Sequence, residues 1–470
     1  MKVVWFRRDL RTLDNTALLR AIDTGEPVLA LYVASPEQWQ THHMSPAQSD
    51  LIKRRLVELN HELDALNIPL LYQQVATFDD MVDLLAEVVS EYHCDEVFAN
   101  KEYEVNEVLR DEKVAEHLTK HQVKWRSFDD KCLLKPGAVL NKQGEYFKVF
   151  TPYKKAWLKQ YQPPVIEKTS PATEHRQDVT QWRYHGDVVW DYPVVDTATN
   201  WPVQTREILA ALRQFCRQES RHYHQRRDFP SLDATSRLSA YLAIGALSAR
   251  QCVARLFYES HHSDLNEGQE TWLSELIWRE FYQHLLFFEP KLVKGQAFLP
   301  WETRIQWRQS EAWLTRWQQG KTGYPIVDAA MRQLNQDYWM HNRLRMVVAS
   351  FLVKDLQLDW RLGEQYFMSQ LIDGDFAANN GGWQWSASTG CDGQPYFRIF
   401  NPITQGKRFD EAGQFIRRWL PELASVPDNY IHEPWRWSRF NTLTYPEPMV
   451  EHKQARLITL DWFKQAKDGE

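Results

Sequence analysis

The hydrophobic pattern of this 470-residue chain changes its period partway along, and that change constrains the fold most. In the first 130 residues, short apolar runs typical of buried strands alternate with segments of helical period. The predicted strands are Val3–Phe6, Val28–Val33, Pro69–Tyr72 and Val97–Ala99, and helices such as Ala47–Leu66 and Phe78–Tyr92 lie between them. This alternation favours a doubly wound parallel sheet with helices on both faces.

Between residues 160 and 202 the pattern is lost, and beyond that point it is helical. The stretch holds two adjacent prolines and little periodicity, which indicates a long linker. Further on, Gly245 and Gly320 are typical of helix ends, and Ser248 is typical of a helix N-cap. We therefore predict an N-terminal α/β domain over residues 1–130, an interdomain linker over 131–202 and an all-helical C-terminal domain over 203–470.

Composition excludes several classes of protein. The chain has no run of about eighteen apolar residues, so we expect no membrane span. Its five cysteines form no CxxC pair, so we expect neither a disulfide framework nor a metal site. The N-terminal sequence KVVWFRRDLR has the features of neither a signal peptide nor a transit peptide, which predicts a cytoplasmic protein.

Positive charge changes its character along the chain. The net charge is −6, but residues 201–470 contain 24 Arg and 8 Lys, against 10 Arg and 14 Lys before them. Arginine is the better group for bidentate phosphate contacts and for stacking on aromatic rings. The overall balance is not that of a bulk nucleic-acid binder, whose pI lies above ~9. It does allow a local basic surface on the second part of the chain.

Two predicted helices of the second part carry polar and aromatic residues on one face. Within Trp272–Leu286 the residues at helical spacing are Glu275, Trp278, Arg279 and Tyr282. Within His341–Leu356 they are Asn342, Arg345, Met346 and Ala349. A solvated, salt-bridged face would account for the charges but not for a tryptophan between them. The chain has 21 tryptophans, which suit either a packed core or stacking platforms. Here the pattern favours a pocket wall.

Two further segments combine residues that suit ligand binding. Asp373–Trp385 reads DGDFAANNGGWQW, in which paired glycines permit a tight turn or a close backbone approach, and Asn379 and Asn380 are candidate helix caps. In Ala234–Gly245, a threonine and a serine stand where a helix N-cap is expected, and such a helix start suits an anion. Neither a GxGxxG sequence after the first strand nor a GxxxxGK[ST] sequence is present.

Together these motifs resemble those of the photolyase/cryptochrome family. The resemblance includes WFRRDLR (Trp5–Arg11), TSRLS (Thr235–Ser239), WRE (Trp278–Glu280), TGYPIVDAAMRQL (Thr322–Leu334), NRLRM (Asn342–Met346) and DGDFAANNGGWQW. It covers essentially the whole chain and is strongest with bacterial class I cyclobutane pyrimidine dimer (CPD) photolyases of the folate-antenna type. It implies that FAD lies in the helical domain, which would explain the missing GxGxxG.

The resemblance also implies which residues hold the FAD. TSRLS would contact the phosphates, Asp373 would pair with Arg345 against the flavin, and Asp375 would face the polar edge of its ring. The implied FAD contacts are Tyr223, Thr235, Ser236, Arg237, Leu238, Ser239, Arg279, Asn342, Arg345, Asp373, Asp375 and Asn379, with Asn379 opposite flavin N5.

The implied activity is light-driven DNA repair by a carbon–carbon lyase. Blue light excites the reduced, anionic flavin, an electron passes to a flipped-out dimer, the ring splits and the electron returns. The implied substrate contacts are Glu275, Trp278, Asn342, Arg343, Met346 and Trp385. Glu275 and Asn379 would act in catalysis, and the implied electron-transfer chain to the flavin is Trp307, Trp360 and Trp383.

The resemblance further implies an antenna pigment and a DNA partner. Asn106, Glu107 and Lys294 match positions that hold 5,10-methenyltetrahydrofolate, and 8-hydroxy-5-deazaflavin is the alternative antenna. The partner is UV-damaged DNA containing CPDs, which a monomer would bind, with Arg226 and Arg227 as candidate contacts to its backbone.

Three other functions remain as alternatives. A cryptochrome-type photoreceptor is disfavoured because residue 379 is Asn and because no long tail follows the family core before Glu470. A 6-4 photoproduct photolyase is disfavoured because His341 is followed by Asn342 where that subfamily tends to place two histidines. A single-strand binder would need a larger basic surface and no cluster of acid, amide and glycine.

Overall fold

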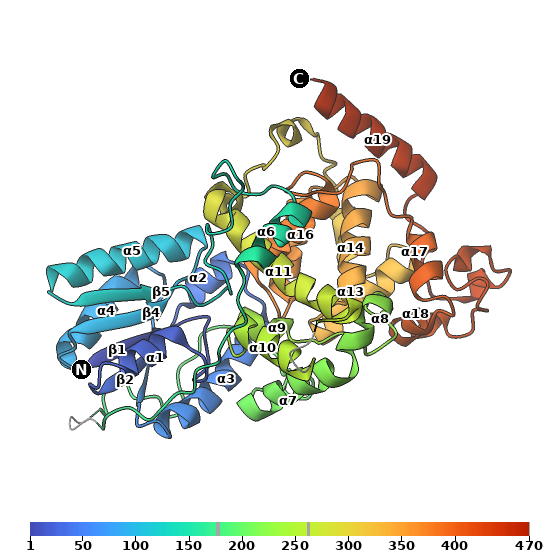
Figure 1. Ribbon diagram of the computed structural model, residues 1–470. Helices are drawn as coiled ribbons and strands as arrows, with labels where there is room; N and C mark the ends of the chain where they lie inside the picture. The colour runs from blue at the N-terminus through green and yellow to red at the C-terminus, as the bar shows by residue number, and fades with distance from the viewer. Residues whose placement is uncertain (175–178, 261–263, 470) are drawn as a thin grey trace.

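A computed structural model describes residues 1–174, 179–260 and 264–469 and shows two parts side by side (Figure 1). The N-terminal part is built on a five-stranded, fully parallel sheet in the order β3-β2-β1-β4-β5. The strands are β1 (Lys2–Phe6), β2 (Val28–Ala34), β3 (Leu70–Gln74), β4 (Glu96–Asn100) and β5 (Lys124–Phe128). The predicted α/β class is confirmed.

Alternate residues of the strands enter two separate cores, which makes the sheet doubly wound. Val4 of β1 packs in the core that also contains residues of α1 (Thr16–Ile22) and α3 (Pro46–Asp64). Its neighbour Val3 packs in the core formed with α4 (Asp80–Glu91) and α5 (Val105–Lys120). The alternation follows from the two-residue period of a strand. A short helix, α2 (Pro36–Thr41), follows β2.

The sequence did not predict β5, and the reason is its place in the sheet. β5 pairs only with β4 and is therefore an edge strand, on which Lys124 and Arg126 are exposed. Its sequence, KWRSF, has no apolar run of the kind that marks a strand covered on both faces.

The predicted linker contains one helix, α6 (Phe150–Gln160), followed by a segment that lies along the sheet. Tyr72 of β3 donates its backbone N–H to the carbonyl of Trp182, and Tyr184 donates to the carbonyl of Leu70. This segment therefore returns across the α/β part, and the domain boundaries at residues 130 and 202 remain a prediction.

Beyond residue 204 the described chain is helical. Its α-helices are α7 (Thr205–Gln218), α8 (Tyr223–Arg226), α9 (Ser239–Ala243), α10 (Ala249–Glu259), α11 (Glu267–Phe288), α12 (Glu311–Gln318), α13 (Pro325–Asp337), α14 (Asn342–Ser350), α15 (Trp360–Gln370), α16 (Phe376–Ala387), α17 (Pro402–Phe409), α18 (Gln414–Trp419) and α19 (His452–Asp468). None of the helices described is both long and apolar enough to cross a bilayer.

The predicted helix ends at Gly245, Gly320 and Ser248 are confirmed. Ser248 caps α10 with a capping box, in which its hydroxyl accepts from the Gln251 N–H. Gly245 has a φ of 68°, and an added Cβ would lie 2.2 Å from the Arg8 carbonyl oxygen. Only glycine permits both the left-handed backbone and this close approach of the two parts.

Candidate cofactor and substrate site

A cavity of about 540 Å³ lies inside the helical part, and it collects nearly all the side chains singled out from the sequence. The polar faces predicted on α11 and α14 both point into it. All twelve implied FAD contacts line it, together with Glu275, Trp278, Met346, Trp383 and Trp385. Its volume lies within the range of ~300–1,000 Å³ that is usual for ligand pockets.

The TSRLS segment lines the cavity, but the predicted helix start at Thr235 and Ser236 is wrong. α9 begins only at Ser239, and its N-cap position is occupied by Leu238, which has no capping side chain. Arg237 has a φ of 50°, a left-handed conformation that ends any helix before α9 begins. The segment thus presents two hydroxyl groups and the Arg237 guanidinium from a non-helical turn.

Arg345 and Asp373 form an ion pair in the cavity wall. Arg345 Nη2 lies 2.8 Å from Asp373 Oδ2 and 3.1 Å from Oδ1, and the carboxylate side chain is only 3% exposed. The Arg345 Nε donates to the Met340 carbonyl, which fixes the guanidinium in place. The cavity therefore contains an oriented cation and anion side by side.

Asp375 caps α16, which corrects the expectation that Asn379 and Asn380 are caps. Its Oδ1 accepts from the Ala378 N–H at 3.0 Å, so both asparagines lie inside the helix. Asn379 donates to the Glu364 carbonyl at 2.9 Å, and Asn380 donates to the Glu364 carboxyl at 3.2 Å. Burial raises the pKa of the Glu364 carboxyl to about 7.

The paired glycines of α16 form no turn; Gly381 serves close packing, whereas an added Cβ at Gly382 would meet open space beside the cavity. A Cβ at Gly381 would lie 2.1 Å from Tyr282 Cδ1. The ring of Tyr282 therefore lies directly on the helix backbone, and α11 and α16 approach closely across the cavity. Of the two alternatives for the glycines, the tight turn is wrong, and a close backbone approach to a ligand stays a prediction, for which Gly382 leaves room in the cavity lining.

Aromatic rings form another wall of the cavity. Trp278 stacks on Phe150 of α6, with ring centroids 3.7 Å apart and planes 8° apart, and Trp385 also lines the cavity. Glu275 accepts a hydrogen bond from Arg227, which directly follows α8, and this places a carboxylate and a guanidinium beside the indoles. Arg227 and Trp339 line the cavity as well, although no spacing in the sequence marks them as part of a pocket.

Other predicted residues lie away from the cavity lining. Arg343 pairs with Asp228 at 2.8 Å and stacks over Phe409, while Arg226 pairs with Glu219 at 2.8 Å. Trp360 is buried and donates to Glu302 at 2.9 Å, and Trp307 is half-buried beside Phe463. In the predicted tryptophan chain, Trp383 thus lines the cavity, Trp360 is buried and Trp307 is half-buried.

α15 comes very close to Trp383. A Cβ at Gly363 would lie 2.1 Å from Trp383 Cη2, and Trp360 stands one turn earlier on the same helix. The glycine therefore allows α15, which carries Trp360, to pack directly against the cavity residue Trp383.

The start of α5 brings together two predicted antenna residues and one that sequence reasoning missed. His42 lies 2.9 Å from Asn106 Nδ2, and its Nδ1 lies 3.5 Å from Glu107 Oε1. Burial raises the pKa of Glu107, as do the neighbouring carboxylates of Glu104 and Glu102. Lys294 ends a 3-10 turn (Pro290–Lys294) in the helical part. No pattern distinguishes His42 from the histidine that follows it.

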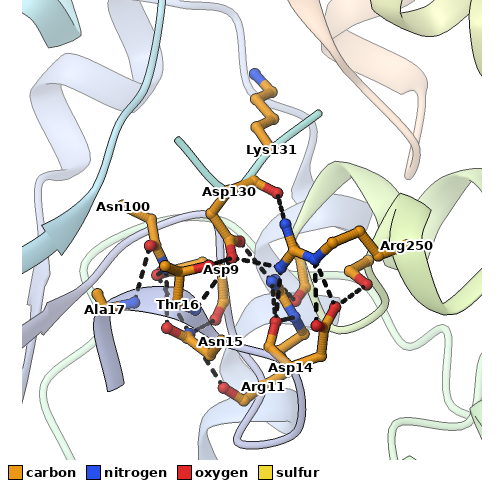
Figure 2. Close-up of polar contacts among 12 residues, drawn as sticks. Asp9, Arg11, Asp14, Asn15, Thr16, Ala17, Asn100, Asp130, Lys131 and Arg250 are labelled. Atoms are coloured by element: carbon orange, nitrogen blue, oxygen red, sulfur yellow. Dashed lines mark hydrogen bonds and ion pairs between the residues drawn. The ribbon is translucent and has the colours of Figure 1, made fainter. Parts of the chain in front are cut away.

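The carboxyl edge of the sheet is filled by a second polar cluster (Figure 2). Asp130 accepts hydrogen bonds from Arg11, from Arg250 Nη2 at 2.6 Å and from the Thr16 hydroxyl at 2.7 Å. Asp14 accepts from Arg250 Nε at 3.0 Å. The space left beside this cluster measures about 20 Å³, which is room for about one water molecule.

The fold and the cavity define a class of protein that holds a ligand of dinucleotide size inside a helical domain beside a doubly wound α/β domain. The donor set suits FAD: hydroxyl groups and an arginine for phosphates, a paired Arg345 and Asp373, and indole rings. Trp383, which lines the cavity, has its Nε1 buried without a partner among the described residues, as expected of a wall that faces a polar ligand.

Comparison with known proteins places the chain in a family. Residues 2–173 match the DNA photolyase family, and residues 272–465 match the FAD binding domain of DNA photolyase. The chain is 56% identical to the deoxyribodipyrimidine photo-lyase of Vibrio cholerae, over 99% of this chain and 100% of that protein. It is 50% identical to the Escherichia coli protein of that name, over 99% of each.

A solved structure shares the whole fold. The bacterial class III photolyase of Agrobacterium tumefaciens superposes with a TM-score of 0.86 at 33% identity, covering 99% of this chain and 98% of that one. The chain belongs to the DNA photolyase family.

Proposed function

We propose that this protein uses light to repair DNA by splitting cyclobutane pyrimidine dimers with bound FAD. The observation that carries the proposal is a single cavity that combines anion donors, an Arg–Asp pair and stacked indoles. The full-length relatives named deoxyribodipyrimidine photo-lyase support the same activity.

In this proposal the chain's own residues hold the FAD in place. The hydroxyl groups and the guanidinium of residues 235–239 bind its phosphates, while Arg345 offers a cation that favours an anionic ring. Asn379 is oriented by its hydrogen bond to the Glu364 carbonyl, so its amide faces the ligand in one fixed position. When bound, reduced FAD supplies under blue light the electron that opens the cyclobutane ring, and it takes the electron back afterwards.

The lesion must leave the duplex to reach the cavity. Extruding a damaged base costs a few kcal/mol, less than an intact base does. Trp278, already held flat by Phe150, receives the dimer on a preformed aromatic surface together with Trp385. Stacking on such a surface contributes ~1–3 kcal/mol per base. Asn342 and Met346 complete the substrate wall, and Glu275, in its protonated form, donates a hydrogen bond to a pyrimidine carbonyl.

Arg227 holds Glu275 before the lesion binds. In the described structure the two side chains form an ion pair in the cavity wall. Glu275 must leave this ion pair and take up a proton before it can donate a hydrogen bond to a pyrimidine carbonyl. Arg227 then stands where it can reach the DNA backbone, and Arg226 and Arg343 extend the positive charge outside the cavity.

Three tryptophans supply electrons to oxidised flavin. Trp383 contacts the cavity, and the close packing at Gly363 brings the helix of Trp360 against it. Trp307 is the most exposed of the three and is the end of the chain nearest to solvent. This order, from cavity to surface, supports the proposed route.

A folate is the antenna that the α/β part supports best. His42, Asn106 and Glu107 offer hydrogen-bonding groups at the start of α5. A deazaflavin at the carboxyl edge of the sheet, where ligands of doubly wound folds bind, would have to displace the Asp130 cluster and fit into about 20 Å³.

A repair assay tests the proposal. The purified, reduced protein is mixed with an oligothymidine that contains CPDs, and the recovery of thymine absorbance is followed in blue light and in darkness. We expect recovery only in light, and a loss of it in Trp278→Ala at sub-saturating substrate. A protein with FAD bound and reduced that recovers no thymine in light would contradict the proposal and favour 6-4 photoproduct repair or photoreception.

A further inference from the structure

A buried lysine of the α/β side reaches Asp375, a carboxylate that lines the cavity. Lys131 follows β5, and its side chain points away from the Asp130 cluster beside it (Figure 2). Its Nζ lies 2.8 Å from Glu104 Oε1, at the start of α5, and 3.8 Å from Asp375 Oδ2, at the start of α16. The three side chains are 9–10% exposed. One ammonium group therefore bridges a carboxylate of each part.

Lys131 also contacts the cavity wall through its backbone. Its carbonyl oxygen accepts a hydrogen bond from Arg279 Nη1 at 2.8 Å, and both Arg279 and Asp375 line the cavity. A substitution of the side chain leaves this backbone contact in place. The effect of the ammonium group on Asp375 can thus be separated from the support given to Arg279.

The charge of Lys131 bears directly on Asp375. The other described hydrogen bonds to this carboxylate come from neutral donors, the Ala378 N–H at 3.0 Å and the Gln283 amide at 3.3 and 3.4 Å. Burial alone would lower the pKa of Lys131, but Glu104 and Asp375 raise it above its ordinary value. The side chain is therefore a cation at neutral pH.

We propose that Lys131 is a positioning residue that fixes the Asp375 carboxylate at the cavity and sets the local charge balance, so that it controls how readily a bound flavin is reduced. The inference rests on the proposed function only in taking FAD as the ligand of the cavity. Charges interact strongly in a buried site. Loss of the ammonium group leaves the negative charge of Asp375 unbalanced beside the ligand, which opposes the addition of electrons to the flavin. Loss of the Glu104 charge favours the addition of electrons.

The test measures the reduction potential of FAD in the purified protein, in darkness and without DNA. In Lys131→Met we expect the ratio of reduced to oxidised flavin at a fixed ambient potential to fall about tenfold, which is ~30 mV for a two-electron couple. Lys131→Arg should keep the wild-type potential. Lys101→Met is the matched control, because Lys101 pairs at 3.4 Å with Asp129, which does not line the cavity, whereas Lys131 pairs with the cavity residue Asp375.

In Glu104→Gln the reduction potential of FAD should shift in the direction opposite to that in Lys131→Met. Removing this carboxylate should raise the potential, because Lys131 then faces Asp375 alone. Equal potentials in the wild type, Lys131→Met and Glu104→Gln would overturn the proposal, as would shifts of the same sign in both variants. If Lys131→Met does not fold, Glu104→Gln still decides between the outcomes. Failure here would leave light-driven repair by the wild type intact, so the two proposals fail separately.

Discussion

The cavity of the helical part and the carboxyl edge of the sheet contain similar side chains in opposite arrangements. At the sheet edge, Asp14 and Asp130 are matched by Arg11 and Arg250, and about 20 Å³ of space is left. In the cavity, charged, hydroxyl and indole groups surround about 540 Å³. In open parallel sheets, ligands usually bind at this edge. In this chain that position is occupied by internal ion pairs.

The difference shows what separates a structural polar cluster from a binding site. At the sheet edge each Asp130 oxygen accepts from the protein itself, so the cluster joins the two parts. In the cavity wall, Trp383 Nε1 has no partner among the described residues. Groups that are oriented but unmatched indicate a ligand, and groups that are matched indicate an interface.

The largest effect on stability should come from the sheet edge. Asp130→Asn removes the charge that balances two buried guanidinium groups, and breaking such a buried pair costs ~3–5 kcal/mol. We expect the free energy of unfolding, measured by urea denaturation, to fall by that amount while FAD affinity stays unchanged. A variant that keeps its stability but loses FAD would reverse the roles of the two regions.

Two buried lysines, one with and one without carboxylate neighbours, should differ in their titration. Lys354 donates to the Ser388 hydroxyl at 2.8 Å and lies 4.1 Å from the Phe463 ring centroid, and burial lowers its pKa to about 7, assisted by Lys467. Lys131, which has two carboxylate neighbours, has a raised pKa. Of these two lysines, only Lys354 should therefore titrate in the folded protein near neutral pH.

The consequence for stability has a definite sign. Between pH 7 and about 10 the folded state holds Lys354 neutral while the unfolded chain protonates it, so stability should rise with pH, by ~3 kcal/mol in all. Urea unfolding at a series of pH values measures this slope, which Lys354→Met should flatten. An identical slope in the wild type and the variant would show that Lys354 is charged when folded.

A smaller free-energy change, in the binding of DNA, is expected from a substitution in the aromatic wall of the cavity. Trp278→Ala removes a stacking surface worth ~1–3 kcal/mol per base, which corresponds to roughly 5- to 150-fold weaker binding of a CPD oligonucleotide. Trp125→Ala is the matched control, since Trp125 packs against Trp5 in the α/β part. Fluorescence anisotropy with labelled DNA measures both variants. Equal losses would mean that the indole of Trp278 does not contact the lesion.

The smallest effect on stability should come from a solvent-exposed ion pair, in contrast to the ion pairs of Asp130. Lys113 Nζ lies 2.6 Å from Asp79 Oδ1, but the two side chains are 56% and 76% exposed. Lys113→Ala should change the free energy of unfolding by less than ~0.5 kcal/mol, because solvent screens such pairs. A loss comparable to that of Asp130→Asn would show that burial does not control the strength of these pairs.

Periodicity in the sequence predicted the faces of α11 and α14 that line the cavity, because a helix places residues three and four apart on one side. It predicted four of the five strands but not the exposed edge strand β5. It also placed the start of the helix near Thr235 too early. Arg237 has a left-handed backbone conformation and its guanidinium lies over the ring of Trp339, a distant residue that helical spacing does not relate to it.

Contacts between distant segments were beyond the sequence. Nothing in the spacing of residues relates His42 to Asn106 within the α/β part, or Lys131 to Asp375 across the two parts, because these contacts form only in the folded chain. The roles of individual residues in FAD and lesion binding came from motif resemblance, and those roles are proposals for the experiments above.

The most direct test of the central claim compares FAD affinity in one variant from each region. Arg345→Met removes the cation paired with Asp373 in the cavity, and Asp130→Asn removes the centre of the sheet-edge cluster. Titration of the apoprotein with FAD, followed by flavin fluorescence, should show at least about tenfold weaker binding in Arg345→Met, or ~1.4 kcal/mol, and wild-type binding in folded Asp130→Asn. Unchanged binding in Arg345→Met together with lost binding in Asp130→Asn would contradict the assignment of the cavity as the flavin site.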